Sequence, residues 1–177
     1  NTFLNIRRQF ESYLVNPLYN EYKVMWMALF FKRIYDLRVD NDLLQRDIAK
    51  ILNVNKNTYP HWEKGMYEIP IDIIDKLANF YNVSIDYITG LSDDKGSYGK
   101  RYNLNLIGKR LKEIRVGNKL TQKEMSEITG FGQMNYSRYE RGVIVIPFSK
   151  LYLIAKRFNV SLDYLMGKSD KVKIMVH

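Results

Sequence analysis

The stretch LTQKEMSEITGFGQMNYSRYERG (120–142) decides the fold. Thr121 is followed three residues later by Glu124, a capping-box pattern that predicts the start of a helix. The glycines of GFG (130–132) end that helix, and a second helix is predicted to begin near Gln133. Two short helices joined by a three-residue turn that contains glycine form the helix-turn-helix pattern.

The flanking sequence supplies further helices and no convincing strand. Upstream, LIGKRLKEIRVGNK (106–119) places apolar residues on one stripe at helical spacing and then reaches Gly117. Downstream, Pro147 suits the first turn of FSKLYLIAKRF (148–158), and Ser161 suits the cap of a one-turn helix that Gly167 closes. The sequence therefore predicts an all-α fold, with VKIMV (172–176) as the one candidate strand or a simple tail.

The whole pattern occurs twice, 77 residues apart. Residues 34–93 and 111–170 share 20 identities in 60 ungapped positions. Between the copies, DKGSYGKRYN (94–103) has the glycine, serine and charge of a linker. The predicted organisation is an N-terminal helical extension, a divergent first domain, the linker, a second domain and a tail, with bounds 1–20, 21–93, 94–103, 104–170 and 171–177.

The wording of the second copy resembles the Cro/C1-type repressor DNA-binding domain, also called the XRE family. The resemblance rests on 120–142 followed by IP…LYLIAKRFNVSLDYLMG, and it extends less faithfully over residues 30–93. It implies two tandem lambda-repressor-like domains of five helices each, and a third helix that enters the major groove of double-stranded DNA. No cofactor and no metal are expected.

The resemblance also assigns candidate DNA-contacting residues. Side chains that offer paired donors and acceptors, such as Gln133 and Arg138, can read base edges, whereas Met134 could make only apolar contact. Gln122 begins the second helix, where exposed amides and the helix dipole favour a phosphate. The full set carried over in the second copy is Gln122, Lys123, Gln133, Met134, Asn135, Ser137, Arg138 and Arg141.

Two further pairs are predicted to be structural. Arg115 with Glu140, and Arg38 with Glu63, resemble a family pair that links the first helix to the end of the third and sets its angle. Tyr136, Tyr139, Ile128, Leu151 and Ile154 are assigned to the core. Asp86 and Asp163 each follow a serine cap by two residues, so helix capping explains them and catalysis is not expected.

The first copy departs from the pattern where DNA reading would need it. Leu44 replaces the capping threonine, and Pro60 falls inside the expected recognition helix. Proline there removes a backbone hydrogen bond and either kinks the helix or, if the helix begins late, lies in its first turn. The corresponding readers would be Lys56, Asn57 and His61, so this copy either reads DNA or serves only for docking.

The N-terminal region is unusually apolar. Met25, Trp26, Leu29, Phe30 and Phe31 exceed what one buried helix face needs. Either residues 1–20 fold back over this surface, or it forms a homodimer.

Charge and composition narrow the function. Residues 1–93 carry 11 Lys and Arg against 12 Asp and Glu, and residues 94–177 carry 17 against 7. The C-terminal half therefore suits a polyanionic partner. The absence of cysteine and the presence of two histidines argue against metal clusters, and no catalytic motif, small-molecule site, membrane span or export signal is recognised. We expect a cytoplasmic, non-enzymatic, sequence-specific DNA-binding transcriptional regulator that acts mainly through its C-terminal helix-turn-helix; the alternative is a protein–protein adaptor or antirepressor with the same fold.

Overall fold

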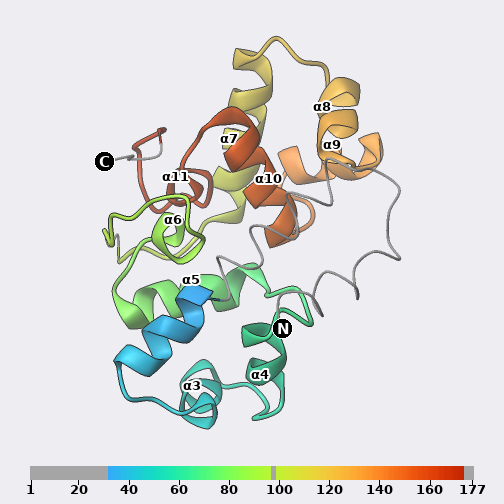
Figure 1. Ribbon diagram of the computed structural model, residues 1–177. Coiled ribbons are helices and arrows are strands. Elements are labelled where there is room, and N and C mark those ends of the chain that lie inside the picture. The colour runs from blue at the N-terminus through green and yellow to red at the C-terminus, as the bar shows by residue number, and fades with distance from the viewer. Residues whose placement is uncertain (1–31, 97–98, 174–177) are drawn as a thin grey trace, which may run out of the picture. The chain divides into compact units, whose positions relative to one another are not determined.

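A computed structural model describes residues 32–96 and 99–173 (Figure 1). Every regular element within those ranges is a helix, which confirms the predicted all-α fold. The expectations for the extension 1–20, for the apolar residues 25–31 and for most of VKIMV lie outside the described residues. Contacts divide the described chain into two units: residues up to Ile69 with Ile88–Gly90, and Pro70–Tyr87 with the residues from Leu91 onward.

The first unit contains a helix at residues 32–40, then α3 (Gln45–Leu52) and α4 (Thr58–Glu63). Leu44 is the N-cap of α3 and accepts no side-chain cap bond, although its amide donates to the Asp47 carboxylate at 2.9 Å. Pro60 is the third residue of α4. It therefore lies in the first turn, where a missing amide costs little. Of the two alternatives for this helix, the structure shows the one in which the helix begins late.

The second unit contains the remaining helices: α5 (Ile71–Tyr81), α6 (Ile85–Ile88, of which the first three residues belong here), α7 (Leu104–Gly117), α8 (Gln122–Thr129), α9 (Gln133–Glu140), α10 (Phe148–Phe158) and α11 (Leu162–Leu165). Thr121 caps α8 as predicted, because its hydroxyl accepts from the Glu124 amide and the Glu124 carboxylate accepts from the Thr121 amide. Pro147 is the N-cap of α10, one residue before the predicted first turn.

The core of the second unit is aliphatic and aromatic. The predicted core residues Tyr136, Tyr139, Leu151 and Ile154 are all buried. Ile128 is 42% exposed, so its assignment to the core was wrong. The reason is the periodicity of the helix. α8 buries Met125, Ser126 and Thr129 on one stripe, and Ile128 lies beside that stripe.

The sequence repeat is also a repeat of hydrogen bonds. The Tyr87 amide donates to Ser84 Oγ and the Tyr164 amide donates to Ser161 Oγ, both at 3.0 Å, so each serine caps its own helix. Asp86 and Asp163 also cap helices, but each caps the helix that carries the other. Asp86 accepts from the Leu162 amide at 2.7 Å, and Asp163 accepts from the Ile85 amide at 3.1 Å. Sequence spacing could not reveal this exchange.

Candidate nucleic-acid interface

The turn between α8 and α9 is fixed from outside the helix pair. Gly130 ends α8 with φ of 66°, a left-handed conformation that favours glycine. Lys150, on α10, donates from Nζ to the Thr129 carbonyl at 3.2 Å and lies 5.0 Å from the centre of the Phe131 ring. The cation therefore neutralises the carbonyl end of α8. Nothing in the sequence pattern singled out Lys150 for this role.

A close backbone approach sets the depth of α9. α9 packs against α7 and α8 (Figure 1), and its C-terminal carbonyls reach Gly108 on α7. A Cβ added at Gly108 would lie 2.5 Å from the Glu140 carbonyl oxygen and 2.8 Å from that of Tyr139. Only glycine accommodates this approach. A glycine within the helical pattern of 106–119 was the available sign of it.

A buried charged network holds the end of α9, as the predicted Arg115–Glu140 pair requires. Arg115 donates to the Glu140 carboxylate at 2.5 and 3.2 Å and to the Leu120 carbonyl at 2.9 Å. The Gln122 side-chain amide donates to the same carboxylate at 2.8 Å. Burial raises the pKa of Glu140, but the hydrogen bonds from Arg115 and Gln122 lower it more, so the pKa lies below its ordinary value. The same bond to Glu140 raises the pKa of Arg115.

Much of the outer face of α9 is exposed. Gln133, Met134 and Asn135 are exposed, Met134 to 78%, while Ser137 and Arg138 are half-buried. Among the described residues, no hydrogen bond or ion pair engages the side chains of Gln133 or Arg138. The face thus offers an amide and a guanidinium to solvent, on one helix, with a thioether between them.

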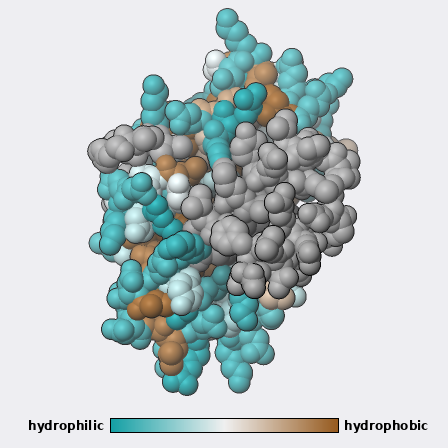
Figure 2. Space-filling view, viewed as in Figure 1, coloured by the Kyte–Doolittle hydropathy of each residue, from teal (hydrophilic) through white to brown (hydrophobic). Residues whose placement is uncertain are grey.

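The surroundings of this face are polar and carry both signs of charge, since α8 exposes Glu124 and Glu127 as well as Lys123. Lys123 and Arg141 are exposed, and Arg141 Nε donates to the Ser137 carbonyl at 3.3 Å. Glu140, the single acidic residue of α9, is buried in its ion pair. Figure 2 shows mainly hydrophilic residues around the end of the second unit where α7 and α8 lie, with a small hydrophobic patch among them. Polyanions are therefore not repelled by α9 itself.

The first copy keeps the Arg–Glu ion pair but does not present its candidate DNA-reading residues on one helical face. Arg38 donates to both oxygens of Glu63 at 2.8 Å, which confirms the second predicted pair. Lys56 and Asn57 precede α4 in a turn, so they do not share its helical face with His61. The His61 Nδ1 atom lies 3.2 Å from Met66 Sδ, and its ring packs edge-on against Tyr67. The three candidate readers are not brought together on one helix.

The described residues contain no group of three His, Cys, Asp or Glu side chains that could hold a metal ion. In the same residues we find no helix with the length and apolar character needed to cross a bilayer.

Comparison with known proteins identifies the class. Residues 108–171 match the family described as "Helix-turn-helix domain", and residues 34–88 match the one described as "Helix-turn-helix". The chain is 36% identical over 58 residues to the uncharacterized HTH-type transcriptional regulator MJ0272 of Methanocaldococcus jannaschii, covering 33% of this chain and 88% of that protein. The chain belongs to the Cro/C1-type (XRE) helix-turn-helix family, with two family domains in tandem.

Among its relatives are named regulators. The chain is 44% identical over 57 residues to the cryptic phage CTXphi transcriptional repressor RstR of Vibrio cholerae, covering 32% of this chain and 51% of the relative. It is 42% identical over 67 residues to the HTH-type transcriptional regulator ImmR of Bacillus subtilis, covering 38% of this chain and 53% of that regulator. The chain thus spans about half the length of these two relatives. No solved structure matches it significantly.

Proposed function

We propose that this chain binds double-stranded DNA as a transcriptional regulator and reads sequence chiefly through α9. The observation that carries the proposal is the outer face of α9, where Gln133 and Arg138 are held on one helix without protein partners in the described chain. A single helix fits the major groove, and these side chain types pair with adenine and guanine edges. The names of RstR and ImmR support regulation of transcription.

The anchoring of α9 supports the same proposal. Direct reading of bases requires side chains on a helix whose position is fixed, and the Arg115–Glu140–Gln122 network fixes its C-terminal end. Because Gln122 is engaged with Glu140, we propose that its remaining polar atoms and the first amides of α8 meet a phosphate together. Lys123, Asn135 and Arg141 add phosphate contacts, whereas Met134 and Ser137 lie toward the bases.

We propose a lesser role in sequence reading for the first copy. Its α4 has six residues against eight in α9, and Lys56 and Asn57 lie before it rather than on it. These residues can still contact phosphates. Affinity should depend strongly on salt, because Lys and Arg release counterions from DNA.

The experiment starts with selection of bound sites from a random DNA pool, followed by titration of the selected site and of an unrelated duplex. Arg138→Ala should weaken binding to the selected site by about 1–3 kcal/mol and should weaken binding to the unrelated duplex less. The matched control is His61→Ala, at the equivalent position of the first repeat. This variant should change the affinity for the selected site little. Equal losses from the two variants would refute reading through α9, and no binding at low salt would refute DNA binding altogether.

A further inference from the structure

A second surface of the chain is built like the interface of a symmetric dimer. The residues that form it lie in the second unit, in segments 70–87 and 91–96 on one side and 160–173 on the other. The Asp86 carboxylate accepts from the Leu162 amide, and 77 residues away the Asp163 carboxylate accepts from the Ile85 amide. Position i contacts j, and the equivalent of j contacts the equivalent of i. This reciprocity defines a local two-fold interface.

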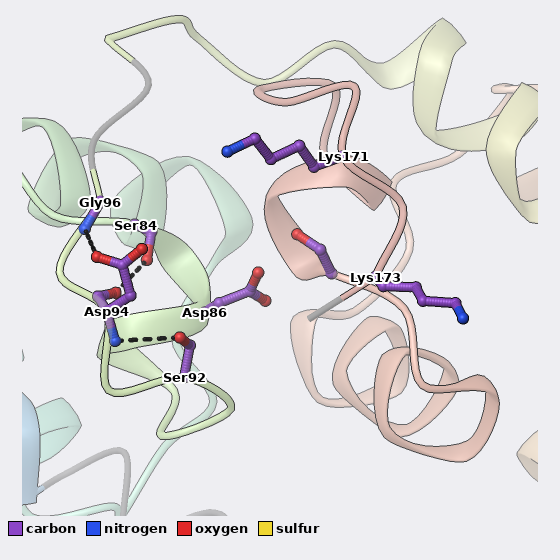
Figure 3. A pocket seen from close by; sticks show the side chains of 8 residues that line it. Ser84, Asp86, Ser92, Asp94, Gly96, Lys171 and Lys173 are labelled. Atoms are coloured by element: carbon purple, nitrogen blue, oxygen red, sulfur yellow. Dashed lines mark hydrogen bonds between the residues drawn. The ribbon is translucent and has the colours of Figure 1, made fainter. Parts of the chain in front are cut away.

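The segments beside this contact repeat as well. The Ser84 amide donates to the Lys95 carbonyl at 2.6 Å, and the Ser161 amide donates to the Val172 carbonyl at 2.8 Å. Figure 3 shows Asp86 pointing from α6 toward the start of α11, with the residues around Asp94 on one side and Lys171 and Lys173 on the other. We call the matched segments 84–87 and 161–164, together with 91–95 and 168–172, the joint.

One contact between the joint and α5 breaks its symmetry. Lys168 Nζ donates to the Asp75 carboxylate at 2.5 Å, to the Asn79 side-chain oxygen at 2.9 Å and to the Lys100 carbonyl at 2.6 Å. The side chains of Lys168 and Asp75 are 1% and 2% exposed. A buried ion pair with this many hydrogen bonds is satisfied, but either charge alone would be costly.

The repeat shows what each half would meet if it paired with a copy of itself. The residue equivalent to Lys168 is Leu91, and the residues equivalent to Asp75 and Asn79 are Tyr152 and Lys156. Two first repeats would place Leu91 against Asp75 and bury a carboxylate without its cation. Two second repeats would place Lys168 against Tyr152 and Lys156 and bury an ammonium beside another. Only unlike repeats satisfy both charges.

We infer that the joint is an internal dimer interface which the Lys168–Asp75 pair restricts to one first repeat and one second repeat of the same chain. The linker favours the partner in the same chain, because a short tether gives it a local concentration of order millimolar. The ion pair then removes the competing pairings of like repeats, as mismatched charges do at other specific interfaces. The partner of this surface is therefore the other half of the molecule, not a second copy.

The test exchanges the charges. Asp75→Lys and Lys168→Asp each place two like charges in the joint, and each should lower the folding equilibrium constant by about 100- to 1,000-fold. The two changes combined in one chain restore opposite charges and should recover most of that loss. An equimolar mixture of the two single variants carries the same complementary residues on separate chains, and it should remain as unstable as either alone, with no new species in sedimentation velocity.

Two results would overturn the inference. Recovery of stability in the mixture, together with a heterodimer of the two variants, would show that the joint forms between chains. Failure of the double variant to recover would show that the pair does not set the pairing. If the reversals do not fold, Asp75→Asn and Lys168→Met leave no like charges, and a thermodynamic cycle on them must show coupling of at least fivefold. None of these measurements uses DNA.

Discussion

A single added methyl group tests how α9 is positioned. In Gly108→Ala the new Cβ would meet two backbone oxygens of α9, at 2.5 and 2.8 Å, and backbone cannot yield as a flexible side chain does. Alanine also gains about 1 kcal/mol over glycine in a helix. Overpacking of a closed contact costs about 1–3 kcal/mol. The net change in the free energy of unfolding should therefore lie between zero and a loss of about 2 kcal/mol.

A control on the same helix separates these opposing contributions. Gly117, the last residue of α7, has no atom within 4 Å of an added Cβ, so Gly117→Ala gains helix propensity without a clash. Urea unfolding followed by circular dichroism should place Gly108→Ala about 1–3 kcal/mol below Gly117→Ala. Gly108→Ala should also weaken binding to a selected DNA site, because α9 must shift to relieve the contact. Equal stability and equal affinity of the two variants would refute the argument that this approach positions α9.

For three further substitutions, the structure determines whether stability should rise or fall. Glu140→Gln leaves the guanidinium of Arg115 without its carboxylate and should cost about 3 kcal/mol in urea unfolding at pH 7. Because the pKa of Glu140 is lowered, wild type loses this advantage as pH falls through that pKa, and the two proteins should converge in acid. Leu44→Thr supplies the missing cap of α3 and should stabilise the first unit by about 1 kcal/mol in denaturation experiments; a loss would contradict the capping argument. Burial and the charge of Asp86 raise the pKa of Asp163 to about 7, so the folded state holds a proton that the unfolded state releases above about pH 4. The contribution of Asp163 to stability should fall between pH 4 and pH 7 by a few kcal/mol, and Asp163→Asn should remove that part of the pH dependence; unchanged slopes would contradict it.

Local patterns predicted the parts of the fold that local chemistry determines. The Thr121–Glu124 capping box and the serine cap of α11 lie where the sequence placed them, because each involves residues three positions apart. The Arg115–Glu140 pair, 25 residues apart, was predicted through the family resemblance. Ile128 was misassigned because hydrophobicity alone does not decide which flank of a short helix is buried.

The contacts that sequence reasoning missed are those between distant elements. Lys150 reaches the carbonyl end of α8 from α10, and Lys168 reaches Asp75 across 93 residues. Both lysines belong to a basic half of the chain, where each looked like one more surface charge. The exchanged caps of Asp86 and Asp163 are hidden for a related reason, since either residue could equally have served its own helix. The selection of DNA-reading residues in the second copy remains a prediction.

The burial of Lys168 against Asp75 has a consequence for how promoter occupancy would depend on the amount of protein in the cell. A regulator assembled from separate subunits must find its partner first, so at low abundance the occupied fraction of a promoter rises with the square of the amount synthesised. In the regulator proposed above, the two halves are joined within each polypeptide, so this assembly step would be absent and occupancy would rise in simple proportion to copy number. Random variation in synthesis would then reach the promoter without being amplified.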